Sequence, residues 1–162
     1  MAHTTLIHAT CIAVGGKGVL LLGKPGSGKS DLALRLIDEP GRGTGDEFLT
    51  AKHVADDQVR LTRDGEKVLA QAPETLSGLL EIRGIGIVQV PYLPVVPVEL
   101  VVELMNEEAV ERMPDETQTR HYLLGLGVPR VAIDPANPSA PARLRAALIC
   151  CAGGEKRRQI CC

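Results

Sequence analysis

Most apolar residues of this chain lie in short runs separated by segments rich in glycine, proline and charged residues. Such runs are typical of strands in a buried sheet, and the first of them predict strands at residues 4–14 and 18–22. Residues 30–38 have a different pattern, because their apolar positions recur at helical spacing. This segment predicts a helix that ends before Pro40. Its apolar face consists of Leu32, Ala33, Leu36 and Ile37.

The rest of the chain alternates between expected strands and shorter helical segments. Residues 60–70 predict a hairpin that turns at Asp64 and Gly65, a favoured pair for a two-residue turn. Further strands are expected at residues 51–59, 85–90 and 96–105 and within 125–135. Helices are expected at residues 73–80, 106–113 and 142–152, the last capped by Ser139 and ended by Gly153 and Gly154. Many strands with few helices indicate an α/β fold with a mixed sheet.

The chain has 162 residues, enough for one domain with a sizeable core. We expect a single domain over residues 1–154 and a flexible tail at residues 155–162. The formal net charge is −2, so the basic excess that marks nucleic-acid binders is missing. Only three aromatic side chains are available to stack on bases: Phe48, Tyr92 and Tyr122. We therefore expect no nucleic-acid partner.

The location of the protein follows from segments that the sequence does not contain. No run of about 18 apolar residues predicts a membrane span, and the N-terminus does not read as a signal peptide. The five cysteines are odd in number and four of them form adjacent pairs, which matches neither a disulfide framework nor a zinc site. We expect a cytoplasmic protein without a membrane partner.

One segment matches the phosphate-binding loop of nucleotide-binding proteins. It lies between the expected strand at 18–22 and the expected helix at 30–38, the context that the motif requires. Its residues are Gly23, Lys24, Pro25, Gly26, Ser27, Gly28, Lys29 and Ser30. Glycines let successive backbone N–H groups surround phosphate oxygens, and the helix N-terminus adds partial positive charge. We expect ATP here, with Lys29 at the β- and γ-phosphates and Ser30 as a Mg²⁺ ligand.

The phosphate loop alone does not name the reaction. The sequence has no guanine-reading segment of the Asn-Lys-x-Asp type, which argues against a GTPase, and no arginine-rich lid of a simple nucleotide kinase. An acidic pair, Asp56 and Asp57, ends the expected strand at 51–59. Strand alternation would point the two carboxylates in opposite directions, one toward the phosphate loop. The other carboxylate could hold metal or orient its neighbour.

The segment around the acidic pair and three further segments occur in a recognisable order. His8 precedes the phosphate loop, Val54-Ala55-Asp56-Asp57-Gln58-Val59 follows it, and Leu80-Glu81-Ile82-Arg83-Gly84-Ile85-Gly86-Ile87-Val88 comes next, before Glu111-Arg112. This set resembles the catalytic domain of HPr kinase/phosphorylase over residues 6–135. The resemblance implies a P-loop kinase fold with a mixed sheet, similar to phosphoenolpyruvate carboxykinase.

The resemblance also implies roles for the residues that match the family motifs. Asp57 matches the aspartate that accepts the proton of the substrate serine, Asp56 its supporting neighbour, and His8 the histidine that assists proton movement. Lys29 matches the phosphate-loop lysine. The implied Mg²⁺ ligands are Ser30 and Glu81. Arg112 matches an arginine that stabilises charge during transfer, although the residues around it match less closely.

By this resemblance, the expected activity is ATP-dependent phosphorylation of a serine in the phosphocarrier protein HPr, with the reverse phosphorolysis possible. The sequence resembles the short form of the family, without the separate N-terminal domain and with a shortened C-terminus. A homo-oligomer is expected, since the family forms hexamers. Two alternatives stay open: a P-loop kinase of a small molecule, and a non-enzymatic nucleotide sensor. A structural domain with a degenerate loop is disfavoured by the intact Lys29, Ser30 and acidic pair.

Overall fold

A computed structural model describes residues 3–151 of the chain. The strands are β1 Thr4–His8, β2 Thr10–Val14, β3 Lys17–Leu22, β4 Ala51–Ala55, β5 Gln58–Asp64, β6 Lys67–Gln71, β7 Leu79–Ile82, β8 Gly86–Gln89, β9 Val96–Leu104, β10 Arg120–Leu123 and β11 Leu126–Ile133. The helices are α1 Lys29–Asp38 and α2 Ala140–Cys151, and three 3₁₀ turns are η1 Glu74–Leu76, η2 Glu107–Ala109 and η3 Glu116–Gln118.

One large mixed sheet organises these elements. Its strands follow the order β1-β5-β6-β9-β3-β2-β4, with β11 parallel to β9 and β10 antiparallel to β11. The pair β3 and β9 is parallel, whereas β2 runs antiparallel to both β3 and β4. Strands β3, β4, β9 and β11 therefore all run the same way, and their carboxyl ends share one edge of the sheet. The mixed α/β fold predicted from the sequence is confirmed.

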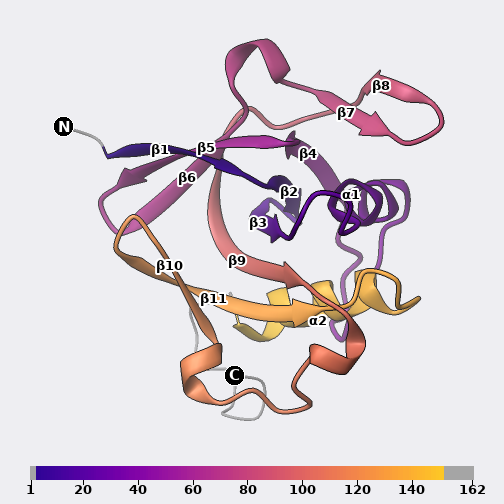
Figure 1. Cartoon of the computed structure of the whole chain (residues 1–162), viewed down its shortest axis with the longest axis vertical. Coiled ribbons are helices and arrows are strands. Elements are labelled where there is room, and N and C mark those ends of the chain that lie inside the picture. Colours follow the sequence, from indigo (N-terminus) through magenta and orange to yellow (C-terminus); the bar gives the residue numbers. More distant parts are fainter. Residues whose placement is uncertain (1–2, 152–162) are drawn as a thin grey trace.

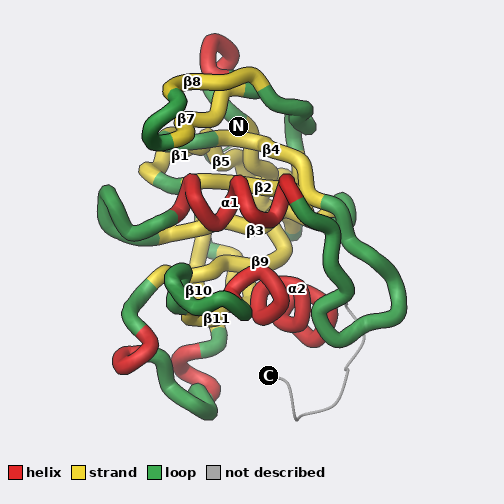
Figure 2. Tube along the Cα trace, turned by 90° about the vertical axis from the view of Figure 1, so that its right-hand side faces the viewer, coloured by secondary structure: helices red, strands yellow, loops and turns green. Residues whose placement is uncertain are grey.

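Apolar side chains form a separate core on each face of the sheet. Both helices cover the same face (Figure 2), where the buried residues of α1 and α2 pack on β2, β3 and β9. The second core lies on the other face and is closed by β5, β6, β10 and β11. The hairpin β7–β8 forms its own small sheet that extends beyond α1 (Figure 1). The hairpin lies over the carboxyl ends of β3 and β4.

The strand predicted at residues 4–14 is two strands in the structure. β1 pairs with β5, whereas β2 pairs with β4, so the chain changes partners at Ala9. The strand predicted at 51–59 likewise ends at Ala55, and β5 begins at Gln58. Both breaks lie side by side, because the Ala9 amide donates to the carbonyl of Asp57 at 3.3 Å. This one-residue change of partner leaves no mark in the apolar pattern.

The hairpin predicted at residues 60–70 is present, but its turn is shifted by one residue. Asp64 pairs with Lys67, so Gly65 and Glu66 form the two-residue turn. Gly65 has a φ of +61°, which suits glycine at the first position of such a turn. The prediction of Asp64 as a turn residue is therefore wrong, because its backbone completes the ladder.

Two predicted helices are mostly absent. At residues 73–80 only η1 is helical, and Leu80 is a buried strand residue of β7. At residues 106–113 only η2 is helical, because that segment has no apolar face to bury: Met113 is 85% exposed. Strand β10 was not predicted. It pairs with β11 through a turn at Leu124 and Gly125.

The last helix begins at Ala140, two residues before its predicted start. Ser139 directly precedes this helix: its carbonyl accepts from the Arg143 amide at 2.8 Å, and its hydroxyl donates to Asn137 Oδ1 at 2.8 Å. The predicted stop at Gly153 and Gly154 and the tail at 155–162 lie outside the described residues. The extent of the domain, residues 1–154, therefore stays a prediction. Over residues 3–151, no helix has both the length and the apolar character that crossing a membrane requires.

Arg145 connects α2 to the C-terminal end of α1 and to Leu49, which lies shortly before β4. Its side chain is only 3% exposed and donates to the carbonyl oxygens of Leu36 (3.1 Å), Glu39 (2.7 Å) and Leu49 (3.2 Å). Burial lowers the pKa of its guanidinium. Because Leu36 and Glu39 lie at the end of α1, this contact fixes the position of the helix that follows the phosphate loop.

We predict that Arg145→Met destabilises the protein by about 1–3 kcal/mol, because it leaves buried carbonyl oxygens without this donor. The matched control is Arg143→Met, two residues earlier on α2, which removes an exposed ion pair with Glu107 and should cost less than about 1 kcal/mol. Urea unfolding of the two variants measures the difference. Equal losses would contradict the structural role of Arg145.

Candidate functional site

Residues from five segments line one cleft of about 930 Å³ at the carboxyl edge of the sheet. These segments are the β1–β2 crossover (residues 8 and 10), the phosphate loop with the start of α1 (25–31 and 34), the acidic turn after β4 (56–57), the β7–β8 hairpin (81–86) and the β11–α2 loop (135–136). Figure 1 shows these elements meeting around the start of α1. The cleft thus gathers segments that are far apart in the sequence.

The phosphate loop has the backbone that its glycines predict. Gly26 and Gly28 have φ angles of +79° and +101°, which other residues adopt at a cost. A Cβ on Gly23 would lie 2.3 Å from the hydroxyl and 3.0 Å from the Cβ of Ser27, so a larger residue here would require the Ser27 side chain to move. No side chain caps the N-terminus of α1 at Gly28. The first amides of the helix are consequently available to an anion such as a phosphate group.

Lys29 lies folded against the loop rather than extended into solvent. Its side chain is 8% exposed, and Nζ donates to the carbonyl oxygens of Gly23 at 2.7 Å and Lys24 at 3.0 Å. Burial lowers the pKa of Lys29, while Asp56 and Asp57 act in the opposite direction. An ammonium group has three donors, so one N–H is left for a phosphate oxygen.

Asp56 is the polar centre of the cleft. Its Oδ1 accepts hydrogen bonds from the hydroxyls of Ser30 and Thr10, both at 3.0 Å. Its Oδ2 accepts from the backbone amide of Glu81 at 3.3 Å. One carboxylate therefore connects the start of α1, the start of β2 and strand β7.

Asp57 faces a different partner. His8 Nδ1 lies 3.3 Å from Asp57 Oδ1, and the two side chains are 50% and 72% exposed. Asp57 is not on a strand, as the sequence predicted, but in a tight turn with a φ of +69°, closed by the Gln58 amide bonding to the Asp56 carbonyl at 2.8 Å. Positive φ is tolerated better by aspartate than by most residues. The turn directs both carboxylates into one cleft, toward different partners.

The remaining predicted residues divide into two groups. Glu81 lies on β7, is exposed, and lines the cleft on the side of Ser30 and Asp56. Arg112 is exposed in the segment between η2 and η3 and is not among the residues that line the cleft. The structure therefore brings together the predicted catalytic and metal-binding residues except Arg112. Of the predicted phosphate loop, Gly23 and Lys24 do not line the cleft, and their carbonyls accept from Lys29 Nζ.

Thr10, Pro135 and Ala136 also line the cleft, and sequence reasoning missed them. Thr10 follows His8 by two residues, a spacing that places both on one face of a strand. That spacing is the only local signal for its role. Pro135 and Ala136 carry no chemistry that a motif would single out, and strand pairing over a long distance along the chain brings them to the cleft.

The donor set fits a magnesium ion bound together with phosphate groups. Within residues 3–151, no group of three or more acidic, histidine or cysteine side chains could hold a metal by itself. Mg²⁺ does not need such a cage, because it keeps several waters and is held by one or two carboxylates and substrate phosphates. Ser30, Asp56 and Glu81 supply a hydroxyl and two carboxylates at the mouth of the phosphate loop.

Comparison with known families decides where this chain belongs. The family model described as HPr Serine kinase C-terminal domain matches residues 1–152. The chain belongs to this family. Its curated relatives include the HPr kinase/phosphorylases of Prosthecochloris aestuarii, 37% identical over 81% of this chain, and Geobacillus thermodenitrificans, 33% identical over 92%. The alignments span 38% and 47% of those relatives, so this HPr kinase-type domain covers less than half of their length.

A solved structure gives the same assignment for the fold. The HPr(Ser) kinase/phosphatase from Coxiella burnetii matches with a TM-score of 0.68 and 26% sequence identity, over 87% of this chain and 91% of that one. The P-loop kinase-like fold that the sequence resemblance implied is thereby confirmed. The roles of individual residues in this HPr kinase-type domain stay predictions.

We predict that Asp56→Asn weakens binding of ATP about tenfold or more when Mg²⁺ is present, because a supporting carboxylate beside a metal ligand has this size of effect. The asparagine Oδ1 still accepts from Ser30 and Thr10, so the fold should persist, although its Nδ2 cannot accept from the Glu81 amide. The control is Asp46→Asn, an exposed aspartate outside the cleft, which should not change the binding of ATP. Calorimetric titration with ATP, with and without Mg²⁺, measures the effect. An equal loss of ATP affinity in both conditions would contradict a metal-related role of Asp56.

Proposed function

We propose that the chain is an ATP-dependent serine kinase that phosphorylates the phosphocarrier protein HPr and also catalyses the reverse phosphorolysis. The observation that carries this proposal is the pair of carboxylates beside the phosphate loop, one bonded to Ser30 and the other paired with His8. A kinase needs a carboxylate for the metal side of the triphosphate and another for the incoming hydroxyl. The curated relatives named HPr kinase/phosphorylase support HPr as the substrate.

In the forward direction the serine Oγ of HPr forms a bond to the γ-phosphorus as the bond to the β–γ bridging oxygen breaks. The hydroxyl proton passes to Asp57, and ADP leaves. His8, 3.3 Å from Asp57, holds that carboxylate in place and can take part in moving the proton onward. The exposure of Asp57 fits contact with a protein substrate. The same residue would return a proton to the serine oxygen when inorganic phosphate attacks phosphoserine and pyrophosphate forms.

The phosphate loop and Lys29 hold the triphosphate in line with the incoming serine. Ser30 and Glu81, with Asp56 between them, are the residues that would hold Mg²⁺, which neutralises charge on the β- and γ-phosphate oxygens when bound. Because phosphoryl transfer needs little covalent help, alignment and charge neutralisation account for most of the catalysis. Arg112 does not line the cleft and has no part in this proposed step.

Incubation of the purified chain with ATP, Mg²⁺ and HPr tests the proposal directly, with the modified residue located by mass spectrometry. We expect one phosphoserine in HPr, and its loss with release of pyrophosphate when inorganic phosphate is added. Consumption of ATP without phosphorylated HPr would instead favour a kinase of a small molecule. Binding of ATP without turnover would favour a nucleotide sensor. We further propose that the protein is cytoplasmic and forms a homo-oligomer, as the family resemblance implies.

Asp57→Asn should remove the kinase activity, by about a hundredfold or more, because the amide keeps the shape of the side chain but cannot accept the serine proton. Binding of ATP should change little, since Asp57 has no hydrogen bond to the phosphate loop. The control is Asp46→Asn, an exposed aspartate outside the cleft. If Asp57→Asn is active and Asp56→Asn is inactive toward HPr with ATP still bound, the roles of the two aspartates are reversed.

A further inference from the structure

The cleft has two chemically different sides, and the order of strands places them on opposite sides of the phosphate loop. The loop follows β3 directly. The acidic turn follows β4, which is separated from β3 by β2, whereas the β11–α2 loop follows β11, which is separated from β3 by β9. At about 4.8 Å per strand, each lies about 10 Å from the line of β3. One side carries Asp56 and Asp57, and the other carries Pro135 and Ala136.

The β7–β8 hairpin belongs to the acidic side. The backbone amide of Glu81 donates to Asp56 at 3.3 Å, so the hairpin is attached to the carboxylate that also binds Ser30. If the γ-phosphate lies on this side, as the proposed function requires, the nucleoside must leave the phosphate loop on the other side, because it is the opposite end of the triphosphate. The wall that it meets there is Pro135 and Ala136.

This wall is in contact with the phosphate loop. A Cβ on Gly28 would lie 3.2 Å from both Cβ and Cγ of Pro135, so the proline ring rests against the loop. The guanidinium of Arg35 donates to the carbonyl of Pro135 and also pairs with Asp31, the residue after Ser30. Pro135 is therefore held at the point where a nucleotide chain would leave the loop and pass the first turn of α1.

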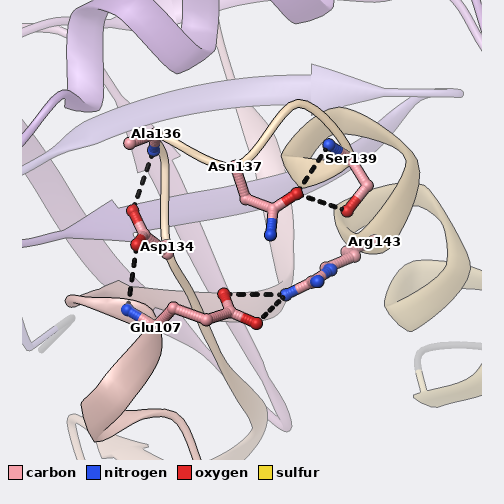
Figure 3. A network of polar contacts seen from close by, with 6 residues as sticks. All are labelled: Glu107, Asp134, Ala136, Asn137, Ser139 and Arg143. Carbon is pink, nitrogen blue, oxygen red and sulfur yellow. Dashed lines mark hydrogen bonds and ion pairs between the residues drawn. The ribbon is translucent and has the colours of Figure 1, made fainter.

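A polar network keeps the same loop in one conformation (Figure 3). Asp134 accepts from the backbone amides of Ala136 and Glu107, both at 2.9 Å. Asn137 Oδ1 accepts from the amide and the hydroxyl of Ser139, at 2.9 and 2.8 Å. Ala136 itself is exposed and lines the cleft. These hydrogen bonds connect the β11–α2 loop to η2 and to the residue that precedes α2.

We propose that Pro135 and Ala136 form the nucleoside-contacting wall of this cleft and that Asp134 and Asn137 are positioning residues for it. The inference rests on the proposed nucleotide-binding function and adds to it the site of the base and ribose. A proline ring and an alanine methyl offer an apolar surface on which the flat face of a base can pack. This wall contacts the nucleoside alone. The phosphates are bound by the loop and Lys29, and the acidic side would hold the Mg²⁺ that accompanies them.

The test compares ATP with inorganic tripolyphosphate, which carries the phosphates without a nucleoside. In calorimetric titrations with Mg²⁺, we expect Ala136→Leu to raise the Kd of ATP about fivefold, a change of about 1 kcal/mol. The Kd of tripolyphosphate should stay within about twofold. Pro135→Ala should produce a smaller loss with the same selectivity. The control is Ala109→Leu, the same change at an exposed alanine outside the cleft, which should alter neither constant.

Two results would overturn the proposal. Equal changes for both ligands, or none for either, would mean that Ala136 does not contact the nucleoside. An ATP-selective loss in Ile85→Ala, a residue of the hairpin side, without one in Ala136→Leu would place the nucleoside against β7–β8 instead. The outcome is independent of HPr: ATP binding with the expected selectivity but no transfer to HPr would refute the proposed kinase activity and leave the nucleoside wall standing.

Discussion

The hydrogen bonds accepted by Asp56 hold the site together. One carboxylate receives the hydroxyls of Ser30 and Thr10 and the amide of Glu81, so that α1, β2 and β7 converge on a single side chain. A half-buried carboxylate is stable only when its oxygens are satisfied in this way. The bond from the Glu81 amide attaches the β7–β8 hairpin, which has its own small sheet, to the same carboxylate that binds Ser30 of the phosphate loop.

The position of Asp56 depends on two breaks between strands that lie next to each other in the sheet. The chain passes from β1 to β2 at Ala9 and from β4 to β5 at Asp57, and the Ala9 amide bonds to the Asp57 carbonyl. His8 and Thr10 flank one break and the acidic pair flanks the other, which produces two matched contacts, His8 with Asp57 and Thr10 with Asp56. The positive φ of Asp57 is the local cost of this crossing, and such strained positions concentrate at functional sites.

The parts of the site that the sequence predicted are those with a local signature. Gly23 to Ser30 form the loop that their spacing requires, because a strand, a glycine turn and a helix follow one another directly. The location of Glu81 beside Ser30 could be predicted only through the family motif, since residues 73–80 otherwise read as a helix. The contacts of Thr10 and Pro135 could not be predicted, because they depend on which distant strands pair. The apolar pattern of Arg120–Leu123 was likewise too short to reveal β10.

The orientation of four strands gives the cleft its direction. Since β3, β4, β9 and β11 run the same way, the loops that follow them share one edge, and the loop after β3 is flanked by acid on one side and by Pro135 and Ala136 on the other. An extended triphosphate bound in the loop would therefore have one reactive and one unreactive end. Two arginines stabilise this arrangement through backbone carbonyls. Arg145 of α2 donates to carbonyls at the end of α1, and Arg35 of α1 donates to the carbonyl of Pro135 in the β11–α2 loop. Arg35 also pairs with the cleft carboxylate of Asp31, whereas Asp56 bonds to two hydroxyls and a backbone amide and Asp57 pairs with His8.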